Sequence, residues 1–598
     1  MARLTTFSRL IITLLIVGGV FFAARMFLGS SGLLDKTVNV VDLERADNAT
    51  NEVLASAPKN YETSGLTQLS LPGEAAFNNG NANKMTYLGM GWNAQTPISY
   101  ANGGANTKAG SLMAKNNIDL TFTRQDDYGK MQEAIVKFAT QYKNNPQAPP
   151  VFCGIMGDNL AAFKVGLDQK LAEVDPSYAV KGFYITGYSY GEDKFIGPVS
   201  WKKDPQKARG GVCAVVLKDG DQNIVIKWAS DNDVPVNPDP TVYDPGRLNF
   251  VGVSTFVEAA DRFVANQGVE LPEVKDGKKT GKTTTAKIDA ASTWSPEDEK
   301  IFKTGRDVVT LLSTKENVKQ MPCLVLGLNK YLEQNVDPTK RFVSALAAAG
   351  DQVKTYDAAL RYGCEMNKDV FGDEVNWYEL YRGKEMEMPS GRTVSVGGSR
   401  SCNLADNADD LGVAENASNC YSSVYTLFAN YMSKLYPQDL PSFPPVAQAL
   451  DLSALKVVYA SSDKGKITEG FKETYSKGDM TEVYGRRNYN IEFESGKAKF
   501  TGQGEKVLEE IFNSLNTTNL RMTIKGYTDN VGNYETNMSL SQARADAVRQ
   551  WVMKRSKYSF PGERFAQVQG YGPDRPVSPN NTPDGRAKNR RVEIIFGD

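Results

Sequence analysis

The stretch Gly526-Tyr-Thr-Asp-Asn-Val-Gly532, followed by Asn537-Met-Ser-Leu-Ser-Gln-Ala-Arg-Ala-Asp-Ala-Val548, decides the fold of the last part of this chain. Residues 521–525 before it have a strand pattern, and the two glycines mark a loop. Residues 539–553 are expected to form a helix, because apolar side chains recur at helical spacing: Leu540, Ala543, Ala547, Val548 and Trp551. The stretch therefore predicts a strand, a polar loop and a helix in succession.

The elements around this stretch complete a small domain. Strands are expected over residues 489–493, 565–570 and 591–596, and a helix over 505–515, which gives the order β-α-β-α-β-β. The run Asn589-Arg-Arg-Val-Glu593 lies near the end of the chain. Together these motifs resemble the OmpA-like peptidoglycan-binding domain. The resemblance covers residues 486–598 and implies an α+β domain that binds peptidoglycan non-covalently.

The resemblance also implies a binding site. The stem peptide of peptidoglycan carries a zwitterionic diamino acid, so its receptor needs an anion and a cation at a fixed separation. The family's pattern assigns Asp529 to the ligand ammonium and Arg544 to the carboxylate, which a guanidinium holds through two parallel hydrogen bonds. Thr528, Asn537 and Arg590 complete the candidate set. The alternative is that Asp529 and Arg544 only pair with each other.

Three residues of these motifs leave alternatives open. Tyr527 stands where the family usually has a histidine. This difference leaves Asp529 and Arg544 in place, so it concerns the affinity for peptidoglycan more than the binding function itself. The Tyr527 hydroxyl can take over a local hydrogen bond. Arg590 and Arg591 either contact the ligand or brace the fold.

The composition narrows the function of the whole chain. With 598 residues, several domains are expected. A formal net charge of −1 shows no overall excess of positive charge of the kind that nucleic-acid-binding proteins carry. The chain has no histidine, which excludes Ser–His and Cys–His couples and histidine-ligated zinc. We therefore expect no enzyme, no cofactor and no metal site.

The cysteines predict a disulfide framework. Six widely spaced cysteines with no C-x-x-C pair suit an oxidising compartment. Pairing of near neighbours would join residues 153–213, 323–364 and 402–420. Six buried free thiols are the alternative.

The N-terminal residues have the pattern of a membrane-targeting segment. Residues 10–24 are apolar apart from one threonine, Arg3 and Arg9 precede them, and Arg25 follows. We expect residues 1–30 to be an uncleaved, single-pass inner-membrane anchor, with the bulk of the chain in the periplasm. Cleavage of a signal peptide and release to the periplasm is the alternative, although Phe22 is bulky for a cleavage site. Residues 31–83 have the composition of a stalk.

From residue 84 onward, strands and helices alternate, which predicts a parallel α/β sheet. Strands are expected over residues 85–90, 118–123, 151–156, 182–186, 248–253, 307–312 and 323–327. In the order of the expected strands and helices and in their residue patterns, residues 84–455 resemble a two-lobed periplasmic solute-binding protein of the ABC-transporter type. The resemblance is greatest to the binders of nitrate, sulfonate and taurine. The segments that carry this resemblance are residues 117–135, 293–296, 307–315, 320–322 and 341–352. Residues 456–485 are expected to be the linker to the last domain.

A solute would bind at the carboxyl ends of the strands in such a protein. The candidates by that rule are Trp92, Asn93, Gly103, Gly104, Tyr188 and Trp294, although each taken alone fits a structural role better. In the polar insertion at residues 271–285, residues 277–283 mimic a phosphate loop but have three residues between the glycines where four are required, so the insertion is expected to be a solvated surface loop.

These patterns predict an α/β protein with a periplasmic-binding-protein-like domain, an OmpA-like α+β domain and one N-terminal transmembrane helix. Its expected function is that of an envelope protein that is anchored in the inner membrane, binds peptidoglycan and carries a receptor or scaffold domain. The substrate-binding component of an ABC transporter, with a small solute and a permease or other envelope complex as partners, is one alternative. A stator-like motor-coupling protein is another, but the apolar span has no ionisable residue to conduct ions.

Overall fold

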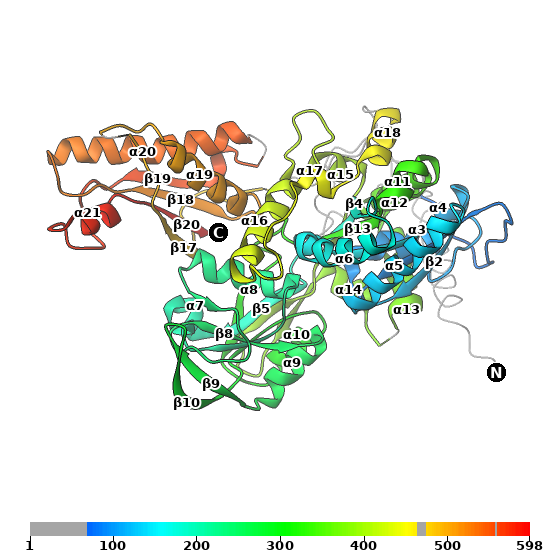
Figure 1. Ribbon diagram of the computed structural model, residues 1–598, viewed down its shortest axis with the longest axis horizontal. Helices are drawn as coiled ribbons and strands as arrows, with labels where there is room; N and C mark the ends of the chain where they lie inside the picture. The colour runs from blue at the N-terminus through cyan, green and yellow to red at the C-terminus, as the bar shows by residue number, and fades with distance from the viewer. Residues whose placement is uncertain (1–68, 373, 463–473, 495, 557–558) are drawn as a thin grey trace, which may run out of the picture.

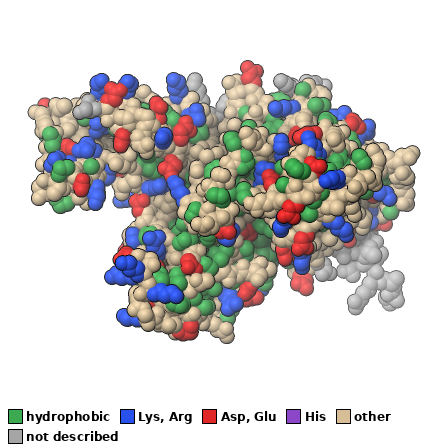
Figure 2. Space-filling view, in the orientation of Figure 1, with side chains coloured by type: hydrophobic (Ala, Val, Ile, Leu, Met, Phe, Trp, Pro, Cys, Tyr) green, Lys and Arg blue, Asp and Glu red, His purple; other side chains and the backbone are tan. Residues whose placement is uncertain are grey.

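The computed structural model describes residues 69–372, 374–462, 474–494, 496–556 and 559–598. The expected membrane anchor and most of the expected stalk lie outside these residues. Within them, no helix is both long enough and apolar enough to cross a membrane. The described chain forms three bodies (Figure 1). Acidic and basic side chains are interspersed over the face seen in Figure 2, as the net charge of −1 leads one to expect.

The first body, lobe 1, is built on a six-stranded sheet in the order β16-β4-β13-β3-β1-β2. Its strands are β1 (Asn83–Gly89), β2 (Ile118–Arg124), β3 (Val151–Met156), β4 (Val180–Ser189), β13 (Pro322–Leu328) and β16 (Ser399–Ser401). The main helices are α3 (Thr96–Asn102), α5 (Tyr128–Asn144), α6 (Leu160–Val174), α12 (Val336–Thr355) and α13 (Asp357–Phe371). Strand β1 pairs in parallel with β2 and β3, so the expected parallel arrangement is confirmed there.

The second body, lobe 2, is inserted between β4 and β13. Its six-stranded sheet has the order β12-β5-β11-β6-β8-β7. The strands are β5 (Asp193–Pro198), β6 (Val212–Val216), β7 (Val236–Asn237), β8 (Leu248–Val253), β11 (Ala290–Trp294) and β12 (Val308–Ser313). The helices are α8 (Gly220–Asp231), α9 (Phe256–Ala265) and α10 (Glu297–Phe302). Residues 190–192 and 314–321 cross between the lobes, as the two-lobed prediction requires.

The third body is the C-terminal domain, a four-stranded sheet in the order β17-β20-β18-β19. The strands are β17 (Val483–Tyr489), β18 (Arg521–Gly526), β19 (Phe565–Gly570) and β20 (Val592–Gly597), and the helices are α19 (Gly502–Leu515), α20 (Tyr534–Arg555) and α21 (Pro583–Asn589). The predicted β-α-β-α-β-β order is confirmed, with α21 as an addition. The first strand was wrongly expected over 489–493: it ends at Tyr489, so it begins inside the expected linker.

This domain packs against both lobes. Helix α19 lies against α16 (Cys420–Leu435), which belongs to the chain segment after lobe 1 (Figure 1). The loop after α19 reaches the second crossing, where the Lys319 amide donates to the Thr517 carbonyl over 3.1 Å. On lobe 2, Arg487 of β17 donates to Ser230 over 3.1 Å. The domain therefore bridges the two lobes at the crossing.

Three expectations need correction or qualification. All six cysteines are free and buried, so the expected disulfides are wrong: Cys153 lies on β3 of lobe 1, whereas Cys213 lies on β6 of lobe 2. The expected loop at residues 271–285 is exposed, but it is the hairpin of β9 (Val269–Lys275) and β10 (Lys278–Ala286). Within the expected stalk, Gly73 and Phe77 hydrogen-bond to the backbone of residues 107–109, so this part packs on lobe 1.

Candidate functional site

Beside the loop that follows β18, the backbone of α20 comes very close to the last residues of two strands, Gly526 of β18 and Gly570 of β19. A β-carbon on Gly526 would overlap the Ser541 carbonyl oxygen, and one on Gly570 would overlap the Gln542 amide. Only glycine therefore lets α20 lie directly on the ends of β18 and β19. This contact sets the start of α20 beside the loop of residues 527–533.

Asp529 of this loop is already paired. Its Oδ2 accepts from Arg590 Nη1 over 2.6 Å, and its Oδ1 accepts from the Val531 amide over 3.1 Å. The Asp529 side chain is 12% exposed and that of Arg590 46% exposed. The cation paired with Asp529 is thus Arg590 and not Arg544, and this pairing is compatible with either role that the sequence left open for Arg590.

Arg544 comes from α20 and lies close to this pair. Its guanidinium packs over the Phe493 ring at 4.7 Å, and its Nε donates to the Lys497 carbonyl over 3.2 Å. Burial, together with the charge of Arg590, lowers the pKa of Arg544, while Asp529 opposes that shift. Arg544 therefore lies within electrostatic range of both Asp529 and Arg590, and its guanidinium is a group that can hold a ligand carboxylate.

Asn537 and Thr528 shape the loop. Asn537 Nδ2 donates to the carbonyls of Asp529 and Val531 over 3.4 and 3.0 Å, and so it braces the loop from inside. The Thr528 amide donates to the Gly572 carbonyl over 2.8 Å. Its hydroxyl is buried and has no hydrogen-bond partner among the described residues. Four of the five predicted residues thus lie in or against one loop, and Arg544 lies within electrostatic range of Asp529.

Tyr527 has a structural role. Its hydroxyl donates to Glu593 over 2.9 Å, its ring stacks on Tyr571, and the Arg591 guanidinium lies 3.8 Å from the ring centre. Burial and the Glu593 carboxylate raise the pKa of Tyr527 to about 12. The hydroxyl thus makes the local hydrogen bond that the sequence led us to expect, and Arg591 braces the fold.

The candidates in the middle of the chain divide into two groups. Trp92, Asn93 and Trp294 follow or end strands and are buried, with side-chain N–H groups that have no partner among the described residues. In contrast, the Tyr188 hydroxyl donates to Asp410 over 2.8 Å. Gly103 caps the C-terminus of α3 and Gly104 follows it, at the helix end opposite Asn93. The structure does not bring these glycines to the expected crevice.

Sequence reasoning missed a group of buried acids where the lobes meet. Asp158 follows β3 in lobe 1, and Asp219 and Asp221 lie at the start of α8 in lobe 2. Glu192 and Asp193 lie at the first crossing. The available signal was their position: each stands directly after a strand or at a crossing, where the crevice of a two-lobed protein is built.

Comparisons with known proteins agree with this geometry at the C-terminus. Residues 492–590 match the model of the OmpA family. Over 75 residues the chain is 47% identical to the peptidoglycan-binding protein ArfA of Mycobacterium tuberculosis, a match that covers 12% of this chain and 22% of that protein. This chain therefore spans about a fifth of that relative's length. The predicted OmpA-like domain is confirmed.

Two solved structures are also similar. A putative MotB-like protein from Desulfovibrio vulgaris is 22% identical, with 19% of this chain and 72% of that chain covered at a TM-score of 0.17. The periplasmic nitrate-binding protein from Synechocystis is 10% identical, with 65% of this chain and 92% of that chain covered at a TM-score of 0.42.

Proposed function

We propose that this chain is an envelope protein that binds peptidoglycan non-covalently through residues 486–598 and carries a two-lobed receptor or scaffold domain without catalysis. The observation that carries the proposal is the ion pair of Asp529 with Arg590, with Arg544 of α20 within electrostatic range, in a domain that matches the OmpA family. A diamino acid offers an ammonium to Asp529 and a carboxylate to the guanidinium groups. The name of the mycobacterial relative supports the same ligand.

The proposal includes anchoring in the inner membrane. Residues 10–24 are apolar, with Arg3 and Arg9 before them, which favours a cytoplasmic N-terminus and a periplasmic body. Cell fractionation should find the intact chain in the inner-membrane fraction, with its N-terminal residues present. A shortened chain that fractionates with soluble periplasmic proteins would favour signal cleavage instead.

Binding to isolated sacculi tests the site. We expect Asp529→Ala and Arg544→Ala to weaken co-sedimentation by about 10- to 100-fold, because each removes a charge-assisted hydrogen bond to the ligand. Arg555→Ala is the matched control, since Arg555 lies at the far end of the same helix and pairs with Glu509. Unchanged retention in both site variants would contradict the assignment.

The substrate-binding component of an ABC transporter is the second candidate. It is favoured by buried polar side-chain atoms without a described partner that lie near strand ends in both lobes, among them those of Trp92 and Asn93 in lobe 1 and Trp294 in lobe 2. A permease encoded beside this chain would support it. A stator-like role is less well supported, because residues 10–24 contain no ionisable side chain for ion conduction.

A further inference from the structure

The sheet of the C-terminal domain has a second face, opposite helices α19 and α20. Those helices pack on apolar side chains of the two central strands, Met522, Ile524, Ile594 and Phe596 (Figure 1). Because side chains alternate along a strand, the residues between them point to the other face. Near the loop of residues 527–533 that face is polar and accessible, since Arg486 and Asn488 of β17 are exposed and Lys525 of β18 is half-buried.

One carboxylate lies at the centre of this region. Glu593 of β20 is in register with Asn488 on one side and with Lys525 on the other. Its carboxylate accepts from the Tyr527 hydroxyl over 2.9 Å and lies 3.4 Å from Arg486 Nε. The Glu593 side chain is only 9% exposed, so these contacts hold the carboxylate in place.

Two stacked tyrosine rings hold further cations against this region. The centres of the Tyr527 and Tyr571 rings lie 5.4 Å apart, and the rings are nearly parallel. The Arg591 guanidinium lies 3.8 Å from the centre of the Tyr527 ring. The Arg575 guanidinium and Lys525 Nζ lie 4.9 and 5.8 Å from the centre of the Tyr571 ring. Contact with the two rings therefore gathers three cations.

We call the four cations of this region the basic face: Arg486, Lys525, Arg575 and Arg591. Among the described residues, the ion pair of Arg486 with Glu593 is the only one that any of them makes. Burial lowers the pKa of Lys525; the Glu593 carboxylate opposes that shift, whereas Arg486 and Arg575 add to it. The cations therefore repel one another, and an anion bound among them would relieve that repulsion.

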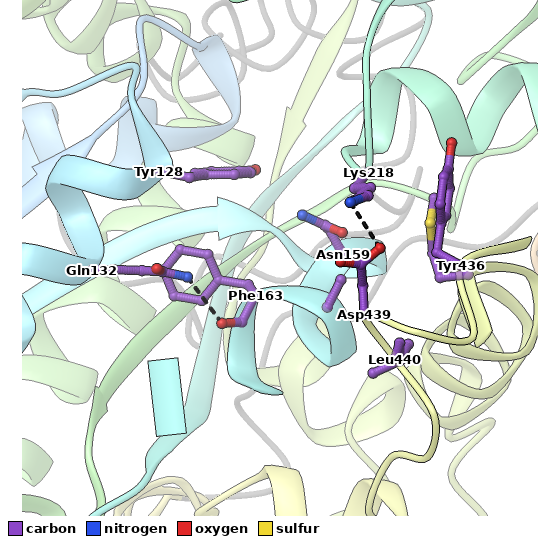
Figure 3. A pocket seen from close by; sticks show the side chains of 10 residues that line it. Tyr128, Gln132, Asn159, Phe163, Lys218, Tyr436, Asp439 and Leu440 are labelled. Carbon is purple, nitrogen blue, oxygen red and sulfur yellow. Dashed lines mark hydrogen bonds and ion pairs between the residues drawn. The ribbon is translucent and has the colours of Figure 1, made fainter. Parts of the chain in front are cut away.

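A cavity where the two lobes meet shows the opposite situation. It has a volume of about 180 Å³ and is lined by Lys218 and Tyr436, among others (Figure 3). Lys218 Nζ lies 2.9 Å from the Asp439 carboxylate and 5.1 Å from the centre of the Tyr436 ring, so this ammonium group is already paired. Three of the four cations of the basic face make no such ion pair within the part of the chain that the structure describes.

Arg591 adds a second, independent observation. It is only 8% exposed. Its Nε donates to Asn488 and its Nη2 to the Arg575 carbonyl, each over 3.2 Å. Its Nη1 is buried and has no hydrogen-bond partner among the described residues. A buried N–H group without an acceptor is costly, so this nitrogen is suited to donate to an oxygen of a bound anion.

The basic face adjoins the proposed site for the diamino acid. Arg591 directly follows Arg590, whose guanidinium pairs with Asp529, and Tyr527 stands two residues before Asp529. Consecutive Cα atoms are about 3.8 Å apart, so a peptide held at Asp529 needs only a few residues to reach across the end of the sheet. A stem peptide has carboxyl groups besides that of its diamino acid, among them the C-terminal one.

We propose that the basic face binds a second carboxylate of the peptidoglycan stem peptide, next to the diamino acid at Asp529. This inference rests on the proposed binding of peptidoglycan and adds a second point of attachment to it. Arg575, Lys525 and Arg591 Nη1 donate to the carboxylate, which a guanidinium holds well because it offers two parallel hydrogen bonds. An ammonium group would meet the repulsion of the four cations.

Titration calorimetry of the full chain with two forms of one stem peptide tests the proposal. Both forms contain diaminopimelic acid with a free ammonium and carboxylate, but in one form every other carboxyl group is amidated. We expect the wild-type chain to bind the unmodified form about tenfold more tightly, because amidation removes a charge-assisted hydrogen bond. Lys525→Gln/Arg575→Gln should bind both forms with the affinity that the wild-type chain has for the amidated one, which also reports that the site at Asp529 is intact.

Two further double variants serve as controls. Lys506→Gln/Lys554→Gln removes two exposed charges from α19 and α20 instead, and it should keep the full preference for the unmodified form. Lys525→Arg/Arg575→Lys keeps both charges of the basic face and should retain the preference as well. A loss of preference in the first control would mean that net charge alone, and not the basic face, attracts the peptide.

Two results would overturn the proposal and leave wall binding in place: equal affinity of the wild-type chain for both forms, or an unchanged preference in Lys525→Gln/Arg575→Gln. Failure of the wild-type chain to bind either form would contradict peptidoglycan binding as well. Vesicles of phosphatidylglycerol and phosphatidylcholine distinguish a lipid partner. Vesicle binding that the same variant loses, with its peptide preference unchanged, would assign the basic face to a membrane surface instead.

Discussion

The raised pKa of the Asp158 carboxyl makes the stability of the folded protein depend on pH. The usual carboxyl pKa of 3.8 is raised to about 8 by burial first and by the Asp219 carboxylate second, while Gln320 and Asn223 act in the opposite direction. Asp193 contributes to the rise, and the Tyr128 hydroxyl faces the same group of acids. The folded state therefore holds this proton more tightly than the unfolded state does.

The sign of the pH effect follows from that difference. A folded pKa above the unfolded one means that the stabilising contribution is complete below about pH 4 and is lost as the pH rises through about 8. We expect the unfolding free energy to fall over this window, and Asp158→Asn to make the fall shallower. Denaturant titrations between pH 5 and pH 8.5 would check this; equal slopes in both proteins would count against it.

Single residues could be predicted from sequence only where a local motif fixes them. Asp529 and Arg544 were found because their loop and helix are adjacent in the chain. The partnership of Asp529 with Arg590 was not predicted, because 61 positions separate them. The buried acids where the lobes meet were missed for the same reason, since Asp158 and Asp221 come from different lobes.

At the scale of elements, the spacing of apolar residues predicted those strands and helices whose own sequence carries a strand or helix pattern. Five of the six strands of lobe 1, all but the short β16, and the order of the C-terminal domain were predicted because buried strands and amphipathic helices carry their own spacing. The β9–β10 hairpin was missed because β10 is mostly exposed lysine and threonine and β9 contains a proline, so no apolar alternation marks it. Helix α3 was missed because it is buried at every position, polar residues included, and so has no exposed face to set a helical pattern.

Helix α12 offers an element-scale prediction. A β-carbon on Gly350 would overlap the Cys402 carbonyl oxygen, so this glycine lets the helix pack against the chain next to β16. We expect Gly350→Ala to destabilise the protein by about 1–3 kcal/mol. Gly166→Ala in α6 is the matched control: the nearest atom would be 3.9 Å away, and the change should stabilise by about 0.5–1 kcal/mol. Equal effects of the two in thermal unfolding would refute the packing argument.

At the scale of the molecule, the wall-binding domain is attached where the lobes join. The Lys319 amide donates to the Thr517 carbonyl, and the Asn519 amide to the Glu316 carbonyl over 3.2 Å. Asn516 donates to Ser423 of α16 over 3.1 Å. These contacts could not be predicted from sequence patterns. Such patterns reflect the fold of each domain, whereas these hydrogen bonds form between domains.

Hydrogen exchange tests this attachment. Thr517 is fully buried beside Lys319, so Thr517→Arg should displace the loop by bulk and by like charge. We expect faster exchange in the crossing segment 313–321, with protection of the C-terminal sheet retained. Gln503→Arg, at the exposed start of α19, the helix that precedes Thr517, is the control. Unchanged exchange in the crossing would mean that the domain does not brace it.

The central claim is that Asp529, Arg544 and Arg590 hold the diamino acid of the cell wall. Competition on isolated sacculi tests it most directly: the full chain is bound, and diaminopimelic acid or the corresponding diamine without carboxyl groups is added. We expect the diamino acid to release the chain and the diamine to leave it bound, because only the former has a carboxylate for the guanidinium groups. Release by neither compound, or equal release by both, would contradict the account.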